Sequence, residues 1–142
     1  MKQRATRWLW ASLANTAVVG FALSLMGCAH FGGLTPVKVS DVKAVAGTWK
    51  GIVYGSSSGP ESIVLTIADD GSFDFVWSLQ PVGESRGKGT MTIRDGRLFF
   101  ESQKGGRGLG TVLTNGAGDR VMSVEATLSD NSIVSAKLSP SL

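Results

Sequence analysis

Short runs in which apolar and polar residues alternate constrain this fold more than any other feature of the sequence. Alternation with a period of two places successive side chains on opposite faces of a β-strand, so such a run predicts a half-buried strand. The 142-residue chain has runs of this kind at residues 48–54, 62–68, 72–79, 87–94, 97–102, 110–114, 120–128 and 133–138. We therefore expect about eight short strands after residue 47.

Turn-forming pairs separate these runs. Asp70-Gly71, Asp95-Gly96 and Asn115-Gly116 suit hairpin turns with positive φ, and Asp130-Asn131 marks a weaker turn. The connections are too short for crossover helices, so neighbouring strands are expected to be antiparallel. These features predict an all-β domain, a small antiparallel up-and-down barrel of about eight strands, with a β-sandwich as the alternative. A helical turn at residues 42–46 is expected before the first strand.

The N-terminal residues have the three parts of an export signal. Lys2, Arg4 and Arg7 supply positive charge, residues 8–26 are mostly apolar, and Gly27 is a small residue before a cleavage point. We predict that residues 1–27 form a signal peptide that is removed. The apolar run of 19 residues is also close to the ~20 that span a bilayer, so an uncleaved anchor is the alternative.

The residues around Cys28, the only cysteine of the chain, form a recognisable motif. Leu25-Met26-Gly27-Cys28 resembles the lipobox of bacterial lipoproteins. The resemblance implies that the Cys28 thiol is diacylglycerated, that cleavage occurs between Gly27 and Cys28, and that the new amino group is acylated, for instance with palmitate. Two or three acyl chains on one cysteine hold a protein firmly to membrane lipid. A plain buried or reactive thiol is the alternative.

The residue after the cysteine bears on location. In the enterobacterial pattern an Asp at this position retains a lipoprotein in the inner membrane, whereas this chain has Ala29. The resemblance thus implies a bacterial cell-envelope protein, lipid-anchored in the outer membrane and facing the periplasm. Residues 28–41 contain Gly32-Gly33 and Pro36 and are expected to form a flexible tether, followed by the barrel domain at residues 42–142.

The positive charge of the chain is concentrated in the leader. The sequence has 14 Lys and Arg against 11 Asp and Glu, and three of the basic residues precede residue 8. The remaining 11 basic and 11 acidic residues balance, so the barrel domain is expected to be near neutral. A nucleic-acid-binding surface needs clustered basic residues on the domain itself. We therefore expect no nucleic-acid partner.

Gly47-Thr48-Trp49 stands near the start of the first predicted strand. It resembles the Gly-x-Trp opening of lipocalin-like (calycin) barrels. The resemblance implies that Trp49 closes one end of the barrel, under a basic residue from a late strand. Lys137 is the candidate for this basic residue in the last alternating run.

The domain lacks the residue sets of common catalytic and metal sites. Nucleophilic catalysis by serine needs a base beside the nucleophile, but the only histidine, His30, lies in the expected tether. One cysteine provides no thiolate cluster for a metal and no internal disulfide. The glycine-rich residues 105–110 lack the spacing of phosphate-binding loops and are expected to form a hairpin loop. We predict a non-enzymatic protein without a cofactor or a metal.

Aromatic residues dominate one face of the third predicted strand. Phe73, Phe75 and Trp77 alternate along it, and Trp49 and Phe100 are expected to face the same interior. These five residues are the candidate ligand-binding wall. Eight strands leave room for packed side chains or for one small ligand, so the wall either lines a site or fills the barrel. The many other inward apolar residues favour a filled core.

The expected function is a non-catalytic one. The first interpretation is an interaction or envelope-associated role for a membrane-anchored lipoprotein, with an envelope protein as its partner. The alternative is binding and carriage of a small apolar ligand inside the barrel. A hydrolase is the least favoured class, because the domain has no histidine or cysteine to activate or replace a serine.

Overall fold

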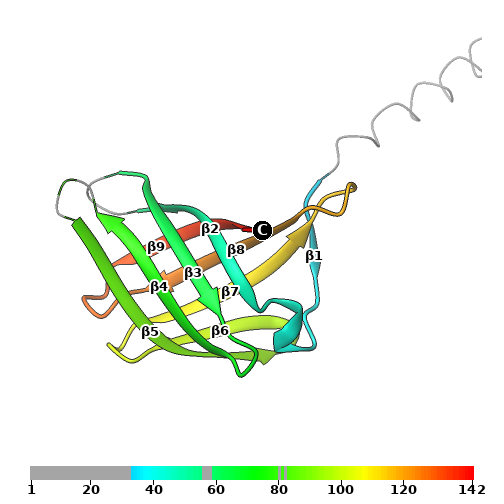
Figure 1. Cartoon of the computed structure of the whole chain (residues 1–142), viewed down its shortest axis with the longest axis horizontal. Helices are drawn as coiled ribbons and strands as arrows, with labels where there is room; N and C mark the ends of the chain where they lie inside the picture. The colour runs from blue at the N-terminus through cyan, green and yellow to red at the C-terminus, as the bar shows by residue number, and fades with distance from the viewer. Residues whose placement is uncertain (1–32, 56–58, 80, 82) are drawn as a thin grey trace, which may run out of the picture. The chain divides into compact units, whose positions relative to one another are not determined.

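A computed structural model shows the fold of the chain and describes residues 33–55, 59–79, 81 and 83–142 (Figure 1). A short 3-10 helix, η1 (Val42–Ala44), occupies the segment where a helical turn was expected. The strands are β1 (Thr35–Val37), β2 (Gly47–Tyr54), β3 (Glu61–Ile67), β4 (Ser72–Leu79), β5 (Gly83–Arg94), β6 (Arg97–Ser102), β7 (Arg107–Thr114), β8 (Arg120–Thr127) and β9 (Ile133–Pro140). The predicted alternating runs therefore correspond to β2 through β9.

These eight strands form a closed antiparallel barrel. Each strand from β2 to β9 pairs with the next one along the chain, and β9 pairs back with β2. The prediction of an up-and-down barrel is confirmed, and the sandwich alternative is wrong. Closure follows from the short hairpin connections, which leave each strand beside its sequence neighbours, and it pairs the first and last strands that would otherwise be open edges.

The predicted positive φ angles are present at two of the three Gly-containing turn pairs. Asp95 and Gly96 both have positive φ, 52° and 80°, in a two-residue turn between β5 and β6, and Gly71 has φ 85°. After β7 the positive φ lies at Gly118 and not at Asn115-Gly116. The reason is a longer loop, in which the Asn115 amide donates to the Asp119 carbonyl across 3.1 Å.

The ordered domain begins earlier than residue 42. Within the segment expected to be a tether, Thr35–Val37 pairs with Val112–Thr114 at the end of β7, which extends beyond the first residue of the antiparallel β6. Val39 is buried, and its amide donates to the Gly96 carbonyl across 3.1 Å. This strand is too short for its alternation to be visible in the sequence, so only the pairing reveals it.

The strand boundaries also differ from the alternating runs at two places. β5 begins at Gly83 and not at Gly87, and β7 begins at Arg107 and not at Gly110. The hairpin loop expected at residues 105–110 is correspondingly shorter. Both extensions lie at the same end of the barrel, where glycine and charged residues hide the period-two pattern although the backbone still pairs.

The interior divides into two halves along the barrel axis. One half, here called the packed half, consists of side chains exposed by 2% or less: Val45, Trp49, Ile67, Met91, Leu98, Val112 and Met122. It lies at the end where β2 begins and β9 ends. The other half lies at the end of the β6–β7 and β8–β9 connections and is hollow, as described below.

The described strands and the core cluster all lie within the compact unit Gly33–Leu142, so this unit has its own complete core. The predicted signal peptide at 1–27, the lipobox and Cys28 lie outside the described residues. Among the residues that are described, no helix is long and apolar enough to cross a bilayer.

Candidate functional site

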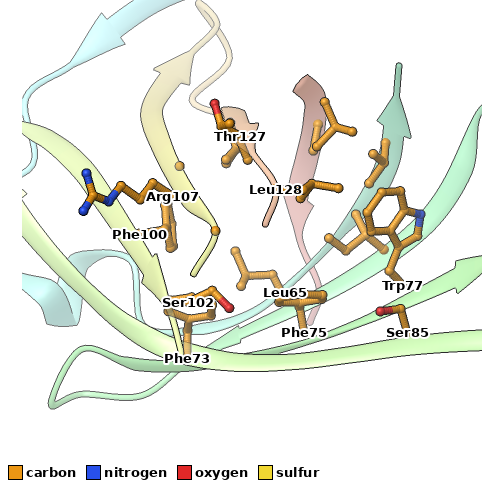
Figure 2. Close-up of a pocket in the computed structure, with 18 of the residues that line it drawn as sticks. Leu65, Phe73, Phe75, Trp77, Ser85, Phe100, Ser102, Arg107, Thr127 and Leu128 are labelled. Atoms are coloured by element: carbon orange, nitrogen blue, oxygen red, sulfur yellow. The ribbon is translucent and has the colours of Figure 1, made fainter. Parts of the chain in front are cut away.

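An apolar cavity of about 230 Å³ occupies the second half of the barrel (Figure 2). Its aromatic lining comes from β4 and β6, and Leu65 and Leu138 lie toward the packed half. The residues that line it are Val53, Ile63, Leu65, Phe73, Phe75, Trp77, Ser85, Arg86, Phe100, Ser102, Lys104, Gly106, Arg107, Gly108, Val124, Ala126, Thr127, Leu128, Ser129, Val134, Ala136 and Leu138. The half of the barrel that contains this cavity is called the open half below.

The cavity exists because small residues occupy inward positions in the open half. The small lining residues are Ser85 on β5, Ser102 on β6, Gly108 on β7, Ala126 on β8 and Ala136 on β9. A barrel of eight strands has a nearly fixed radius, so the volume of the inward side chains decides whether its interior is filled. The expectation of a filled core therefore holds for the packed half and is wrong for the open half.

Two glycines of β5 allow the phenylalanine rings of β4 to lie against the barrel wall. A Cβ atom on Gly87 would run into the Phe75 ring, and one on Gly89 would approach Phe73 Cζ within 2.6 Å. Phe73 in turn packs edge-on against Phe100, with ring centroids 5.3 Å apart and an interplanar angle of 81°. The rings therefore form a supported wall, and Figure 2 shows Phe73 and Phe75 along one side of the pocket.

Four of the five candidate ligand-binding residues line the cavity, and Trp49 does not. Trp49 belongs to the packed half, where its Nε1 donates to the Val45 carbonyl across 2.8 Å. The Arg120 guanidinium carbon lies 5.5 Å from the centre of the Trp49 ring. Trp49 is thus a plug at the packed end of the barrel and not part of the wall predicted from the sequence.

The basic residue over this tryptophan is Arg120 and not Lys137. Arg120 begins β8, and its Nη2 donates to the Ala44 carbonyl of η1 across 2.6 Å, while Lys137 is exposed on the outside of β9. The predicted arrangement, a tryptophan covered by a basic residue from a late strand, is present, but the prediction of Lys137 as that residue was wrong. Only the closed sheet brings β8 and η1 together over Trp49, so the sequence offered no spacing rule for the pair.

The lining also includes polar and charged residues at the strand ends and connections of the open half, which were not predicted from the sequence. Serine and threonine residues and three cationic residues, Arg86, Lys104 and Arg107, belong to this part of the lining. Lys104 Nζ donates to the Arg86 carbonyl across 3.0 Å, and Arg86 Nη2 lies 3.0 Å from Glu84 Oε2 in an exposed ion pair. The glycine-rich sequence between Lys104 and Arg107 suggested a loop, but nothing in it indicated that the loop borders a cavity.

The aspartates of two predicted turns, Asp70 and Asp130, accept hydrogen bonds within those turns. Asp70 Oδ1 accepts hydrogen bonds from the Ser72 hydroxyl at 2.6 Å and the Ser72 amide at 2.8 Å, and these bonds lower the pKa of Asp70. Asp130 and Ser132 repeat this arrangement at the other end of the barrel. Among the described residues, no group of three or more His, Cys, Asp and Glu side chains is placed to hold a metal ion.

No protein-family model matches the chain, and no curated protein matches it. The geometry of the barrel and its cavity is therefore what a functional proposal rests on.

Proposed function

We propose that the barrel binds a small apolar ligand in its cavity. The observation that carries this proposal is an apolar space of about 230 Å³ inside a closed barrel. An apolar cavity of about 150 Å³ is enough to bind benzene. Sites for drug-sized ligands begin at about 300 Å³. The cavity therefore suits a single ring or a short acyl chain better than a large polycyclic ligand.

The resemblance to lipocalin-like barrels supports the same function. Gly47-Thr48-Trp49 opens β2, and Arg120 covers Trp49 at the packed end, as the resemblance implies. We propose on these grounds that the domain is a short lipocalin-like barrel. The role in protein interactions or envelope structure remains a prediction, and the cavity favours ligand binding because a barrel that serves only as a structural module needs no hollow half.

Gly108 offers a direct way to test ligand binding. A Cβ atom added there meets Ala126 Cβ, the Glu125 carbonyl and Phe100 Cβ at 3.5 Å, which is ordinary van der Waals contact, so Gly108→Leu places a side chain into the cavity without a backbone clash. We expect the barrel unit 33–142 to bind 1-octanol saturably, followed by tryptophan fluorescence because Trp77 lines the cavity. Gly108→Leu should weaken binding about tenfold or more, because the leucine side chain excludes part of the ligand chain from the cavity. Loss of two buried ligand methylenes already raises the dissociation constant by about this factor.

Gly116→Leu is the matched control. Gly116 lies in the β7–β8 loop at the packed end, and an added Cβ meets no atom within 4 Å. This variant should bind 1-octanol like the parent protein. Absence of saturable binding by the parent, or equal binding by the parent and Gly108→Leu, would refute the cavity as the site.

We further propose that this barrel is anchored to the bacterial envelope through lipidated Cys28. The support is the lipobox-like Leu25-Met26-Gly27-Cys28 after a charged and apolar leader, together with the balanced charge of the rest of the chain. Two or three acyl chains would hold the domain at a membrane surface. Ala29 favours the outer membrane, with the barrel in the periplasm.

The anchor is tested with the full chain in a two-membrane bacterium. Parent protein should incorporate labelled palmitate and sediment with outer-membrane fractions, and Cys28→Ala should lose both properties. Ser24→Ala leaves the four lipobox residues unchanged and should behave like the parent. A Cys28→Ala protein that is processed and still sediments with membranes would contradict lipidation.

A further inference from the structure

The charged residues that line the cavity are all cations. Arg86, Lys104 and Arg107 contribute to the lining, and no acidic residue does. Glu61 is buried at the start of β3 near the same end of the barrel, but it is not part of the lining. Arg86 and Arg107 stand at exposed, outward-facing positions of β5 and β7, so Lys104 is the cation of this set that does not lie on an outer strand face. An apolar interior bordered by a lysine is complementary to a molecule with an apolar chain and an anionic head.

Lys104 is the cation that is fixed at the opening. The pairing of β5 with β6 ends at Gly89 and Ser102, while β5 continues to Gly83. Lys104, in the loop that follows β6, bridges to this part of β5, which pairs with β4 but not with β6, by donating from Nζ to the Arg86 carbonyl across 3.0 Å. A lysine ammonium has three N–H donors, so this bond leaves two for a ligand.

The other two cations are less available to a ligand. The Arg86 guanidinium pairs with Glu84, which offsets its charge. The Arg107 guanidinium extends away from the middle of the pocket in Figure 2, and Arg107 is the cross-strand partner of Glu101, with both residues exposed. Lys104 is therefore the charge that a ligand head at the opening would meet first.

Resting on the proposed ligand binding, we propose that the ligand class is a single-chain anionic amphiphile. Its chain lies along the wall of Phe75 and Trp77, and its carboxylate or phosphate head accepts hydrogen bonds from Lys104 Nζ. Ser85 and Ser102 stand at inward positions of β5 and β6 among the lining residues, and their hydroxyls can donate further hydrogen bonds to the head. Both the volume and the polarity of the site fit this class, because a short chain fills about 230 Å³ and leaves the head at the polar opening.

Three probes with eight-carbon chains distinguish the contribution of the head group to affinity from that of the apolar chain. They are octanoate, octyltrimethylammonium and 1-octanol, each titrated into the barrel unit 33–142 below its critical micelle concentration. We expect octanoate to bind about fivefold more tightly than octyltrimethylammonium at low salt. This ratio of dissociation constants corresponds to the upper end of the free energies measured for a single exposed ion pair. Added salt should reduce this preference, because Lys104 is exposed and its charge is screened.

Lys104→Gln should abolish the preference for octanoate, and Lys104→Glu should reverse it. Both variants should leave 1-octanol binding unchanged. Lys50→Glu makes the same charge change on the exposed outer face of β2 and should keep the preference. Two results would overturn this inference while the proposed function stands. In the first, 1-octanol binds saturably and the two ionic probes bind with equal affinity. In the second, the preference for octanoate survives Lys104→Glu. Binding of none of the three probes would overturn both.

Discussion

The packed half and the open half of the barrel are built by the same strands and differ in the residues those strands turn inward. Five strands carry a larger residue toward the packed half and a smaller one in the open half: Met91 and Ser85 on β5, Leu98 and Ser102 on β6, Val112 and Gly108 on β7, Met122 and Ala126 on β8, and Leu138 and Ala136 on β9. Strand number largely sets the radius, so the smaller residues of these five strands leave space that the aromatic side chains of β4 and β6 do not fill.

The comparison suggests a division of roles. The packed half is closed by Trp49, Arg120 and η1 through the hydrogen bonds to Val45 and Ala44. Its side chains are almost entirely removed from water, which gives them the largest hydrophobic contribution per residue. The open half lacks such contacts around its empty space and contains an apolar cavity instead. Stability is therefore expected to come mainly from one end of the barrel.

The largest expected effect is on stability, from the same truncation made in each half. Leu98 is fully buried in the packed half, and Leu128 is half-buried and lines the cavity. Leu98→Ala should lower the free energy of unfolding by about 2–5 kcal/mol, because it removes buried contacts and leaves a new void. Leu128→Ala should lower it by about 1–2 kcal/mol, because part of its surface already faces empty space or solvent.

Urea unfolding of the barrel unit measures both values, with the midpoint shift at a constant slope giving the change in free energy. The two variants make an identical chemical change, so each serves as the control for the other. Equal losses in the free energy of unfolding would show that the two halves contribute alike to stability. Such a result would contradict the expectation that stability comes mainly from the packed half. A change in slope would instead point to an altered native or unfolded state.

Most of the fold was predictable because its signals are local. Alternation identified the eight barrel strands, and turn pairs such as Asp95-Gly96 identified their antiparallel connections. The inward placement of Phe73, Phe75, Trp77 and Phe100 follows from the same alternation. β1 escaped detection because three residues show no period, and its position depends on a strand end that no local pattern reveals.

The cavity was not predictable in the same way, because it depends on which inward residues meet at the same level. Register places Gly108 opposite Phe100 on one side and Ala126 on the other. Small residues at these positions were visible in the sequence, but the sequence does not show the strand register that places them at the same level on neighbouring strands. Closure of the barrel likewise decided that Trp49 plugs one end and that Arg120 covers it.

The smallest expected effect compares two matching turns at opposite ends of the barrel. In the β3–β4 turn Ala68 N donates to Ser72 O across 2.8 Å, and in the β8–β9 turn Leu128 N donates to Ser132 O across the same distance. The turns differ in their tertiary contacts, because Gly71 in the first turn accepts a hydrogen bond of 2.7 Å from Met91 N of β5. The turn at the packed end is therefore held more firmly.

Hydrogen bonds from Ser72 lower the pKa of Asp70, and those from Ser132 lower the pKa of Asp130, in each case from an ordinary value of 3.8. A folded-state pKa below the unfolded value means that the unfolded state binds protons more readily, so each turn contributes stability above pH 3.8 that is lost as the pH falls through the folded pKa. Both carboxylates are exposed, so the effect on global unfolding is small. Carboxyl NMR titration should give both pKa values below 3.8. Acidification should also lower the amide protection factor, the unstructured exchange rate divided by the observed rate at the same pH, more at Ser132 than at Ser72. Asp130→Asn should remove the acid dependence at Ser132 and leave that at Ser72. An equal loss of protection at the two amides would mean that packing at one end does not protect its turn, and would contradict the asymmetry between the halves.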